Sequence, residues 1–340
     1  MIKKGIALAM ALLLLFSLVS CGEREAGSSS GPESASSAAA AIDMNVYTLK
    51  GPTGMGMTKL MADADAGAAA NNYKFTLAST PDEIVAAISS KSADIAACPI
   101  NLASSLYNKT GGEVEILAIN TLGVLYVLEN GDSIQSVADL KGRTIYATGQ
   151  GSTPEYILNY VLEKNGIDPA SDVTIEYKSE HSELATLAAS GDAAIAVLPE
   201  PNVTAALAQS EKGLRIALDL TGEWEKVSDS QLAQGCIIAR KDFLETNPDA
   251  VNRFLSEYSQ SVSYVNENLD EASALIEQYG IMAKAALAKK AIPNCNIVFL
   301  SGNEMEQVAK ANLQVLFDAN PSSVGGELPD DSFYYKGYEG

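Results

Sequence analysis

Residues 147–199 read ATGQGSTPEYILNYVLEKNGIDPASDVTIEYKSEHSELATLAASGDAAIAVLP, and they repeat the design of residues 47–99, YTLKGPTGMGMTKLMADADAGAAANNYKFTLASTPDEIVAAISSKSADIAACP. Each segment runs strand, Gly/Thr-rich turn, helix, strand, Ser, helix, strand, Pro. The offset is a constant 100 residues, and Gly51 matches Gly151 as Pro99 matches Pro199. Chance matching in an Ala/Ser-rich chain is the alternative, but Gly, Thr, Glu and Pro matches at element boundaries favour a structural repeat. Two similar α/β lobes side by side enclose a cleft, and clefts bind ligands.

The alternation of strands and helices continues to about residue 240, with short links between the elements. The predicted strands are 45–49, 73–78, 94–99, a long run over 115–129, 144–148, 173–178, 194–198, 214–218 and 235–240. This pattern predicts an α/β fold with mainly parallel sheets and helices on both faces. Beyond it, residues 248–279, 282–290 and 303–317 carry the apolar spacing of amphipathic helices.

A large helical block follows the second copy, so the two copies are not simply tandem lobes. We expect Glu115–Glu129 to carry the chain from lobe 1 to lobe 2 and Ser228–Arg240 to carry it back. Two crossing segments make a hinge, with Gly123 and Gly235 near the crossings. The predicted lobe 1 is residues 43–122 plus 237–340, and the predicted lobe 2 is residues 123–236.

The N-terminus has the pattern of a targeting segment. Lys3 and Lys4 precede an uncharged apolar run, Gly5–Val19, which is too short to span a membrane comfortably. The run ends in Leu-Val-Ser-Cys at residues 18–21, which resembles the bacterial lipobox. We therefore expect a lipoprotein signal peptide over 1–20, a lipid on Cys21 and a flexible Ser/Ala-rich tether over 21–42. An ordinary signal peptide containing Cys, or an uncleaved anchor, is the alternative.

Composition restricts the class of partner. The 340 residues include 43 Asp and Glu against 23 Lys and Arg, which gives a net charge of -20. Such a chain is repelled by nucleic acid, so we expect no nucleic-acid partner. Three cysteines follow Cys21, without CxxC spacing. We interpret Cys98 as a buried thiol, and the pattern leaves a Cys236–Cys295 disulfide open.

Ligands of open α/β sheets bind at the carboxyl ends of strands, which selects the turns after each predicted strand. The sharpest is Gly149–Thr153, where glycines admit a close ligand and a helix N-terminus follows. Its counterpart is Gly51–Gly56, and both turns have the alternative of simple helix caps. Glu200, between two prolines, either faces the cleft edge or lies in an exposed turn. Trp224 either stacks on a ligand or fills a lobe surface, and the single histidine, His181, is a polar loop residue or a ligand contact.

Catalytic and cofactor motifs do not stand out. One histidine without a nucleophile motif argues against a hydrolytic triad, and the chain has neither HExxH nor a CxxC pair. The turns lack the Lys-Ser/Thr of a Walker loop and the third glycine of a dinucleotide fingerprint. We therefore expect no catalytic residues, no metal and no cofactor.

Several motifs together resemble the solute-binding proteins of bacterial ABC importers, and most of all the nitrate/sulfonate/taurine and thiamine-pyrimidine group. The motifs are DLKGRTI (139–145), GSTPEY (151–156), LAASGD (187–192), PEP (199–201) and the segment from Arg240 to Pro248. The resemblance covers roughly residues 43–320. It implies a two-lobed periplasmic-binding-protein-like (type II) fold and a monomer that closes on a small solute and docks on an ABC permease/ATPase complex. It also implies a place at the extracytoplasmic face of the cell membrane, held by the lipid on Cys21.

The resemblance and the strand-end rule together give the predicted ligand-binding residues. They are Thr53, Gly54, Met55, Ser79, Asn101, Gly151, Ser152, Thr153, Glu200 and Trp224. Unlike many anion sites, these turns carry no arginine, and the nearby cations are Lys50 and Lys178. The expected solute is a sulfonate- or nitrate-like anion or a pyrimidine-type vitamin precursor. Two other functions stay open at this point: an enzyme acting on a small metabolite on the same fold, and a sensor or adhesin.

Overall fold

Two β-sheets organise the chain in the computed structural model, which describes residues 40–211 and 213–338. All of these lie in the unit Ala39–Gly340. The predicted signal peptide, Cys21 and nearly all of the predicted tether fall outside the described residues.

Sheet A has six strands in the order β11-β4-β10-β3-β1-β2. Their bounds are β1 (Asp43–Leu49), β2 (Asn72–Ala78), β3 (Ile95–Pro99), β4 (Val114–Leu122), β10 (Ala233–Arg240) and β11 (Ile297–Leu300). Sheet B has five strands in the order β7-β6-β8-β5-β9. Their bounds are β5 (Leu125–Asn130), β6 (Thr144–Thr148), β7 (Thr174–Lys178), β8 (Ile195–Pro199) and β9 (Leu214–Asp219).

The repeat predicted from the sequence is a repeat of the fold. In the first copy β1 pairs in parallel with β2 and β3, and in the second copy β6 pairs in parallel with β7 and β8. Tyr47 lies opposite Ala96 in the first copy, and Tyr146 lies opposite Ala196 in the second. Equivalent turns therefore follow equivalent strands in the two sheets.

The α/β class is confirmed, but both sheets are mixed rather than mainly parallel. β10 runs antiparallel to β3 and β4, and β5 runs antiparallel to β8 and β9. The sheets are mixed because some strands are reached by segments that pass directly from one sheet to the other. The predicted run 115–129 divides at Gly123 and Val124 into β4 of sheet A and β5 of sheet B. A strand that enters a sheet from the other sheet arrives without a βαβ crossover, so it need not be parallel to its neighbours.

Glycines at the predicted hinge serve close packing. A Cβ on Gly123 would lie 2.2 Å from Thr221 Oγ1 and 2.7 Å from a methyl of Leu232, so the outgoing and returning segments touch there. Gly235 was predicted near a crossing, but it lies inside β10 of sheet A. The return passes through the residues between α8 and β10 instead.

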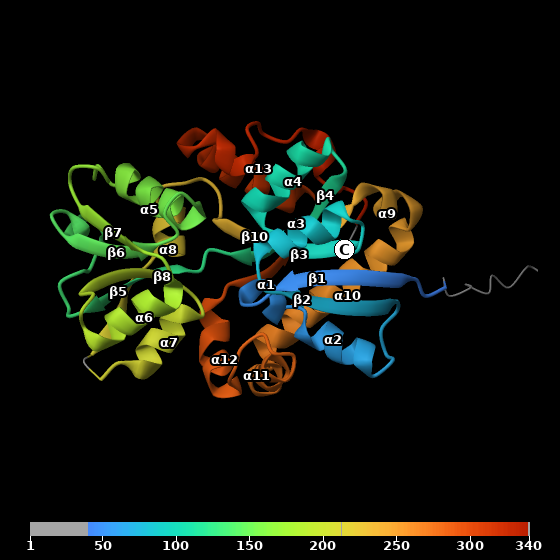
Figure 1. The fold of residues 1–340 in the computed structure, drawn as a ribbon, viewed down its shortest axis with the longest axis horizontal. Coiled ribbons are helices and arrows are strands. Elements are labelled where there is room, and N and C mark those ends of the chain that lie inside the picture. The colour runs from blue at the N-terminus through green and yellow to red at the C-terminus, as the bar shows by residue number, and fades with distance from the viewer. Residues whose placement is uncertain (1–39, 212, 339–340) are drawn as a thin grey trace, which may run out of the picture. The chain divides into compact units, whose positions relative to one another are not determined.

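Helices cover both faces of each sheet (Figure 1). One face of sheet A carries α1 (Pro52–Met55), α2 (Thr58–Asp65), α9 (Lys241–Thr246), α10 (Pro248–Glu267), α11 (Leu269–Gln278) and α12 (Ala285–Ala291). The other face carries α3 (Pro81–Ser89), α4 (Ile100–Thr110) and α13 (Gly302–Ala319). On sheet B, α5 (Thr153–Lys164) and α8 (Leu220–Glu225) cover one face, and α6 (His181–Ser190) and α7 (Asn202–Gln209) the other. Four short 3₁₀ turns are η1 (Val137–Leu140), η2 (Ile292–Asn294), η3 (Pro321–Val324) and η4 (Asp331–Phe333).

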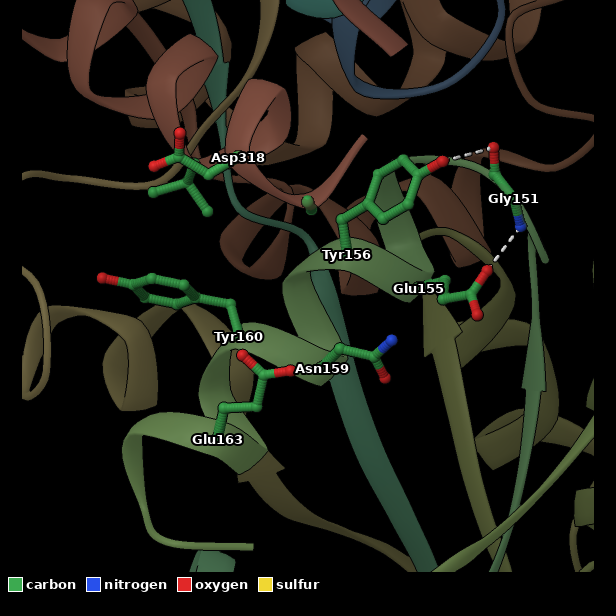
Figure 2. Close-up of a pocket in the computed structure, with 9 residues that line it drawn as sticks. Gly151, Glu155, Tyr156, Asn159, Tyr160, Glu163 and Asp318 are labelled. Atoms are coloured by element: carbon green, nitrogen blue, oxygen red, sulfur yellow. Dashed lines mark hydrogen bonds between the residues drawn. The ribbon is translucent and has the colours of Figure 1, made fainter. Parts of the chain in front are cut away.

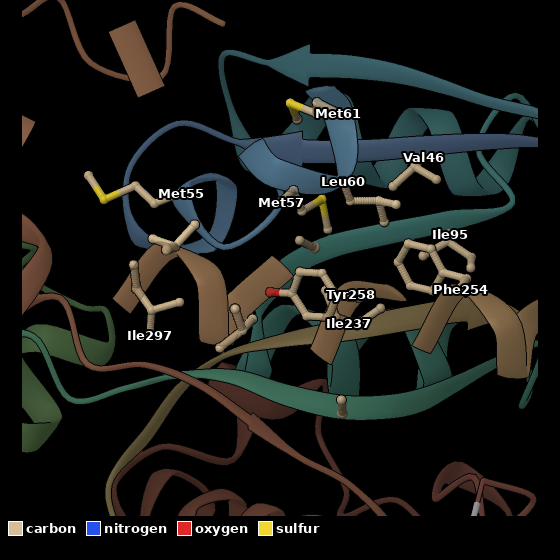
Figure 3. Close-up of a cluster of buried hydrophobic side chains, with 14 of the residues drawn as sticks. Val46, Met55, Met57, Leu60, Met61, Ile95, Ile237, Phe254, Tyr258 and Ile297 are labelled. Atoms are coloured by element: carbon tan, nitrogen blue, oxygen red, sulfur yellow. The ribbon is translucent and has the colours of Figure 1, made fainter. Parts of the chain in front are cut away.

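The core beneath α10 anchors sheet A. Phe254 and Tyr258 stack with ring centroids 5.8 Å apart, and both are fully buried. Figure 3 shows them beside Ile95 and Ile237 of neighbouring strands. This packing holds the strand ends, and hence the turns that follow them, in fixed positions.

One predicted helical region is divided in the structure, and the C-terminal segment joins sheet A. The predicted helix 248–279 is interrupted at Asn268, which separates α10 from α11. The C-terminal residues return to sheet A, where Phe333 is fully buried and Tyr334 forms a parallel bridge to Ile116. The local sequence of this segment does not show that its apolar side chains are buried, because they pack against residues distant in the sequence.

Candidate functional site

A cavity of about 470 Å³ lies where the turns of the two sheets meet. Sheet A contributes Lys50, Thr53 and Asn101, which follow β1 and β3. Sheet B contributes the turn after β6 and the start of α6. Thr121 of β4, Gln234 of β10 and Val124 from the link between β4 and β5 also line the cavity. The cavity therefore occupies the position that the strand-end rule predicts.

Four helices of eight or more residues begin at this cavity. The first two residues of α3, α4, α5 and α6 supply Pro81, Asn101, Thr153 and His181 to its lining. No side chain caps the N-terminus of any of these helices. A helix N-terminus carries partial positive charge and unpaired N–H groups, so the convergence of four favours a negatively charged ligand group.

The charged side chains of the lining also favour a negatively charged ligand group. Among the residues the structure describes, no Asp or Glu lines the cavity, and Lys50 is its one permanent cation. Lys178, the other nearby cation, lies 5.5 Å above the ring of Tyr146 and is not part of the lining. The charged side chains of the described lining thus favour a negative group, although the net charge of the chain is -20.

The turn Gly149–Thr153 is built by its own hydrogen bonds. Gly149 and Gly151 have φ of 76° and 73°, the left-handed conformation that glycine adopts without strain. The Ser152 hydroxyl donates to the carbonyl of Gly149 at 2.6 Å, and the Gly151 N–H donates to Glu155 at 2.5 Å. The Ser152 proton is therefore already used, which leaves its oxygen as an acceptor.

Two threonine hydroxyls, one from each sheet, remain available as donors. Thr53 and Thr153 both line the cavity. Within residues 40–211 and 213–338, neither hydroxyl has a hydrogen-bond partner. They are the equivalent residues of the two repeats, so the fold repeat places one free hydroxyl on each side of the cavity.

His181 lies at the cavity as a neutral side chain. Its Nδ1 is 2.7 Å from the hydroxyl of Thr148, and burial lowers its pKa below the usual 6.5. If Thr148 donates to Nδ1, the Nε2–H is free to donate to a ligand. The predictions left this residue open, and its place after β7 was the signal for it.

The Gln234 amide was not found by sequence reasoning. Its Oε1 accepts from the N–H of Val124 at 2.9 Å, which ties β10 to the link between β4 and β5 beside the cavity. No motif marks a single glutamine in an apolar strand, because its role depends on the neighbouring segment.

Four of the predicted ligand residues line this cavity: Thr53, Asn101, Ser152 and Thr153. Gly54 and Met55 are buried beneath it. Met55 is part of the core, and a Cβ on Gly54 would lie 2.4 Å from the carbonyl of Leu49. We therefore leave both out of the proposed site.

Ser79 and Gly151 lie beside the cavity rather than in its lining. The Ser79 N–H donates to the Glu83 side chain at 3.2 Å, which ties this turn to the first turn of α3. Gly151 lines a second cavity of about 570 Å³ between α5 and α13, shown in Figure 2. Both residues shape the turns without facing the first cavity.

Glu200 and Trp224 take structural positions. Glu200 is 3% exposed, accepts from the amide and the hydroxyl of Thr204, and lies 3.4 Å from the Asn294 amide. Burial raises its pKa. Trp224 is 1% exposed, donates to the Ser230 carbonyl at 2.7 Å and packs on Tyr160. Neither is part of the lining, so both leave the proposed ligand site.

The cysteines are unpaired in the structure. Cys98, Cys236 and Cys295 are free and fully buried, and Cys236 lies opposite Cys98 on the neighbouring strand. Cys236 and Cys295 thus do not form the disulfide that the sequence left open. In the described part of the chain, no group of three His, Cys, Asp or Glu side chains could hold a metal ion. Nor does that part contain a helix that is both long and apolar enough to cross a membrane.

Comparison with solved structures defines the class of fold. An ABC transporter structure from Parabacteroides distasonis is 26% identical, with a TM-score of 0.74 over 86% of this chain and 98% of that one. The periplasmic aliphatic sulphonate binding protein SsuA of Escherichia coli is 17% identical, with a TM-score of 0.66 over 84% and 96%. The alkanesulfonate-binding protein of Xanthomonas axonopodis pv. citri, bound to MOPS, is 17% identical, with a TM-score of 0.60 over 86% and 96%. The chain therefore has the α/β periplasmic-binding-protein fold, as the sequence predicted.

The match to a protein family covers a shorter part of the chain than the matches to solved structures do. Residues 112–272 are similar to the family described as NMT1/THI5 like. The stretch contains β6, α5 and the Gly149–Thr153 turn, which carried the resemblance in the sequence. No curated protein sequence matches the chain significantly.

Proposed function

We propose that this chain is the solute-binding component of an ABC import system and that it captures a small anion in the cavity between the two sheets. The observation that carries the proposal is the convergence of four uncapped helix N-termini on a cavity whose described lining includes Lys50 and no carboxylate. Such a site stabilises a negative group by backbone N–H donors and dipoles, so an arginine is not required.

The solute is a small organic anion of the sulfonate type. The lining mixes hydroxyl and amide groups with Leu49, Leu102 and four prolines, so it offers both hydrogen-bond donors and apolar carbon to a ligand. The binding proteins of similar fold from E. coli and X. axonopodis bind sulfonates, which agrees with this chemistry. Nitrate and a pyrimidine-type vitamin precursor are the other solutes that the test includes.

The mode of action follows from the architecture. The lobe built on sheet A and the lobe built on sheet B each contribute one side of the cavity, and a ligand that contacts both favours their closed arrangement. We propose that the closed protein, a monomer, docks on an ABC permease/ATPase complex. A lipid on Cys21 would hold it at the extracytoplasmic face of the membrane.

The first experiment identifies the solute without assuming it. Small molecules are released from the purified, denatured protein and identified by mass spectrometry, and thermal unfolding is measured with sulfonates, nitrate and pyrimidines. A ligand at one hundred times its Kd adds about 2.7 kcal/mol to the free energy of unfolding. An anion that co-purifies or stabilises supports the proposal. Catalytic turnover of the bound molecule, or stabilisation by organic cations alone, would contradict it.

A pair of lysine variants then tests the site. Lys50→Met removes the cation of the cavity, whereas Lys178→Met removes the nearby cation whose ammonium group lies over Tyr146. We expect the first variant to weaken anion binding about tenfold, the effect of losing one charge-assisted hydrogen bond. The second should bind as the unmodified protein does. Equal effects of the two variants would place the anion elsewhere.

A further inference from the structure

The hydroxyl of Tyr156 holds the turn that faces the proposed solute. It donates to the carbonyl of Gly151 at 3.0 Å, while the N–H of the same glycine donates to Glu155 (Figure 2). Both backbone groups of Gly151 are therefore tied to the first turn of α5. Tyr156 itself lines the second cavity and lies outside the first, so it cannot contact the solute there.

Tyr156 also connects the two sheets. It belongs to α5, which packs on sheet B, but its ring packs in the cluster formed by α3, α4 and α13 on sheet A. There the Asn320 Nδ2 donates to its hydroxyl at 2.9 Å. Asn320 begins the segment Asn320–Val324, which we call the η3 strap.

The η3 strap contacts the opposite side of the cavity as well. The carbonyl of Ser323 accepts from Asn101 Nδ2, and the carbonyl of Val324 accepts from the Ser104 hydroxyl at 2.8 Å. Asn101 lines the cavity from sheet A. One short segment thus reaches the sheet A side through Asn101 and the sheet B side through Tyr156, without entering the cavity.

The direction of each hydrogen bond is fixed by donor counting. The Oδ1 of Asn320 accepts from the amide and the hydroxyl of Ser322, at 3.1 and 2.9 Å, so its Nδ2 must face Tyr156. The Tyr156 oxygen then accepts, and its single proton is left for the Gly151 carbonyl. The orientation of Asn320 thereby decides whether Tyr156 can hold the turn.

We propose that Tyr156 is a positioning residue for the solute site: held by Asn320 of the η3 strap, it fixes the Gly149–Thr153 turn in the conformation that presents Thr153 to the solute. The expected effect of Tyr156 on solute binding rests on the proposed function. The expected effect of Tyr156 on the Gly149–Thr153 turn does not depend on any ligand.

Two substitutions and one control test it. Tyr156→Phe keeps the ring but removes the proton. Asn320→Asp keeps the acceptor for Ser322 but places an acceptor opposite Tyr156, which draws the hydroxyl proton away from Gly151. Tyr160→Phe removes a hydroxyl from the same helix that has no hydrogen-bond partner among the described residues. The readouts are hydrogen exchange of the Ser152 amide, which is bonded to Gly149 within the turn, and the Kd for ethanesulfonate.

Tyr156→Phe and Asn320→Asp should each raise exchange at Ser152 about fivefold, while amides of sheet A and sheet B exchange as before. The Kd for ethanesulfonate should rise by a similar factor in both, and Tyr160→Phe should change neither. Asn320→Asp should have no further effect once Tyr156→Phe is present.

Unchanged exchange at Ser152 in both variants would overturn the inference, as would an equal effect of Tyr160→Phe. A general rise in exchange without a local one would show a packing role only, which also contradicts it. If ethanesulfonate does not bind the unmodified protein, the proposed solute class is wrong, but the exchange experiment still decides the role of Tyr156.

Discussion

Gly235→Ala tests how closely the floor of the cavity is packed. Gly235 lies in β10, where a Cβ would be 2.6 Å from Asn120 Oδ1, 2.8 Å from the methyl of Thr53 and 3.0 Å from Thr121 Oγ1. Ordinary contact begins near 3.4 Å, so the Thr53 methyl must retreat by about 0.6 Å and the Asn120 oxygen by about 0.8 Å. Both neighbours are held by packed elements, so the strain cannot relax freely.

Overpacking of this kind costs about 1–3 kcal/mol of the free energy of unfolding. For a domain of this size each kcal/mol lowers Tm by about 2–4 °C, so we expect a decrease of roughly 2–12 °C. Because Thr53 must move, anion affinity should fall as well. The assay is urea and thermal unfolding, followed by circular dichroism, with binding measured on the folded variant.

Gly222→Ala is the matched control. Gly222 lies in α8, where the nearest atom to a new Cβ is 3.9 Å away, so the added methyl is tolerated. It should leave stability unchanged or raise it by up to about 1 kcal/mol, because alanine favours the helix. If Gly235→Ala is as stable as Gly222→Ala and binds with full affinity, the packing of Thr53 and Asn120 against β10 is not as described.

Three further predictions concern buried groups. Burial raises the pKa of the Glu200 carboxyl in the folded state above its usual 4.5, so the folded state binds this proton more tightly than the unfolded chain does. The stabilisation that protonated Glu200 contributes is therefore lost as pH rises from about 4.5 through the raised pKa of the folded state. Glu200→Gln should therefore become more stable relative to the unmodified protein between pH 4 and pH 7, measured by urea unfolding; a difference that does not vary with pH would contradict the shift. Phe254→Ala should lower the free energy of unfolding by about 3–5 kcal/mol, because Phe254 is fully buried beneath sheet A, and a loss below about 1 kcal/mol would refute that packing. Cys236 and Cys295 are fully buried with raised thiol pKa, so a thiol reagent should label them only after denaturation, and rapid labelling of the native protein would show that they are accessible.

Local signals explain what could be predicted from the sequence. Thr80 and Pro81 marked the start of α3, and the glycines of 149–151 marked the turn after β6; both are features of a few adjacent residues. The repeat added long-range information, because equivalent turns must follow equivalent strands. This is why Thr53 and Thr153 were both assigned to the cavity before the fold was known.

The errors have one physical cause, which is burial by distant segments. Glu200 was expected at the cleft edge or in an exposed turn, and Trp224 on a ligand or a lobe surface. In the structure Glu200 is buried near Asn294, and Trp224 is buried against Tyr160. The prediction of mainly parallel sheets was wrong for a related reason. The direction of β10 depends on where the chain re-enters sheet A and not on the residues of β10 itself. Gln234, likewise, gains its role only from Val124.

The central claim is that converging helix N-termini and Lys50 select a negative charge, and one comparison tests it most directly. Isothermal titration calorimetry measures the Kd of the unmodified protein for ethanesulfonate and for the uncharged ethanesulfonamide, which has nearly the same size and shape. We expect the anion to bind at least about tenfold more tightly than the sulfonamide, and this preference should shrink in Lys50→Met. Equal affinity for the two compounds, or tighter binding of the sulfonamide, would contradict it.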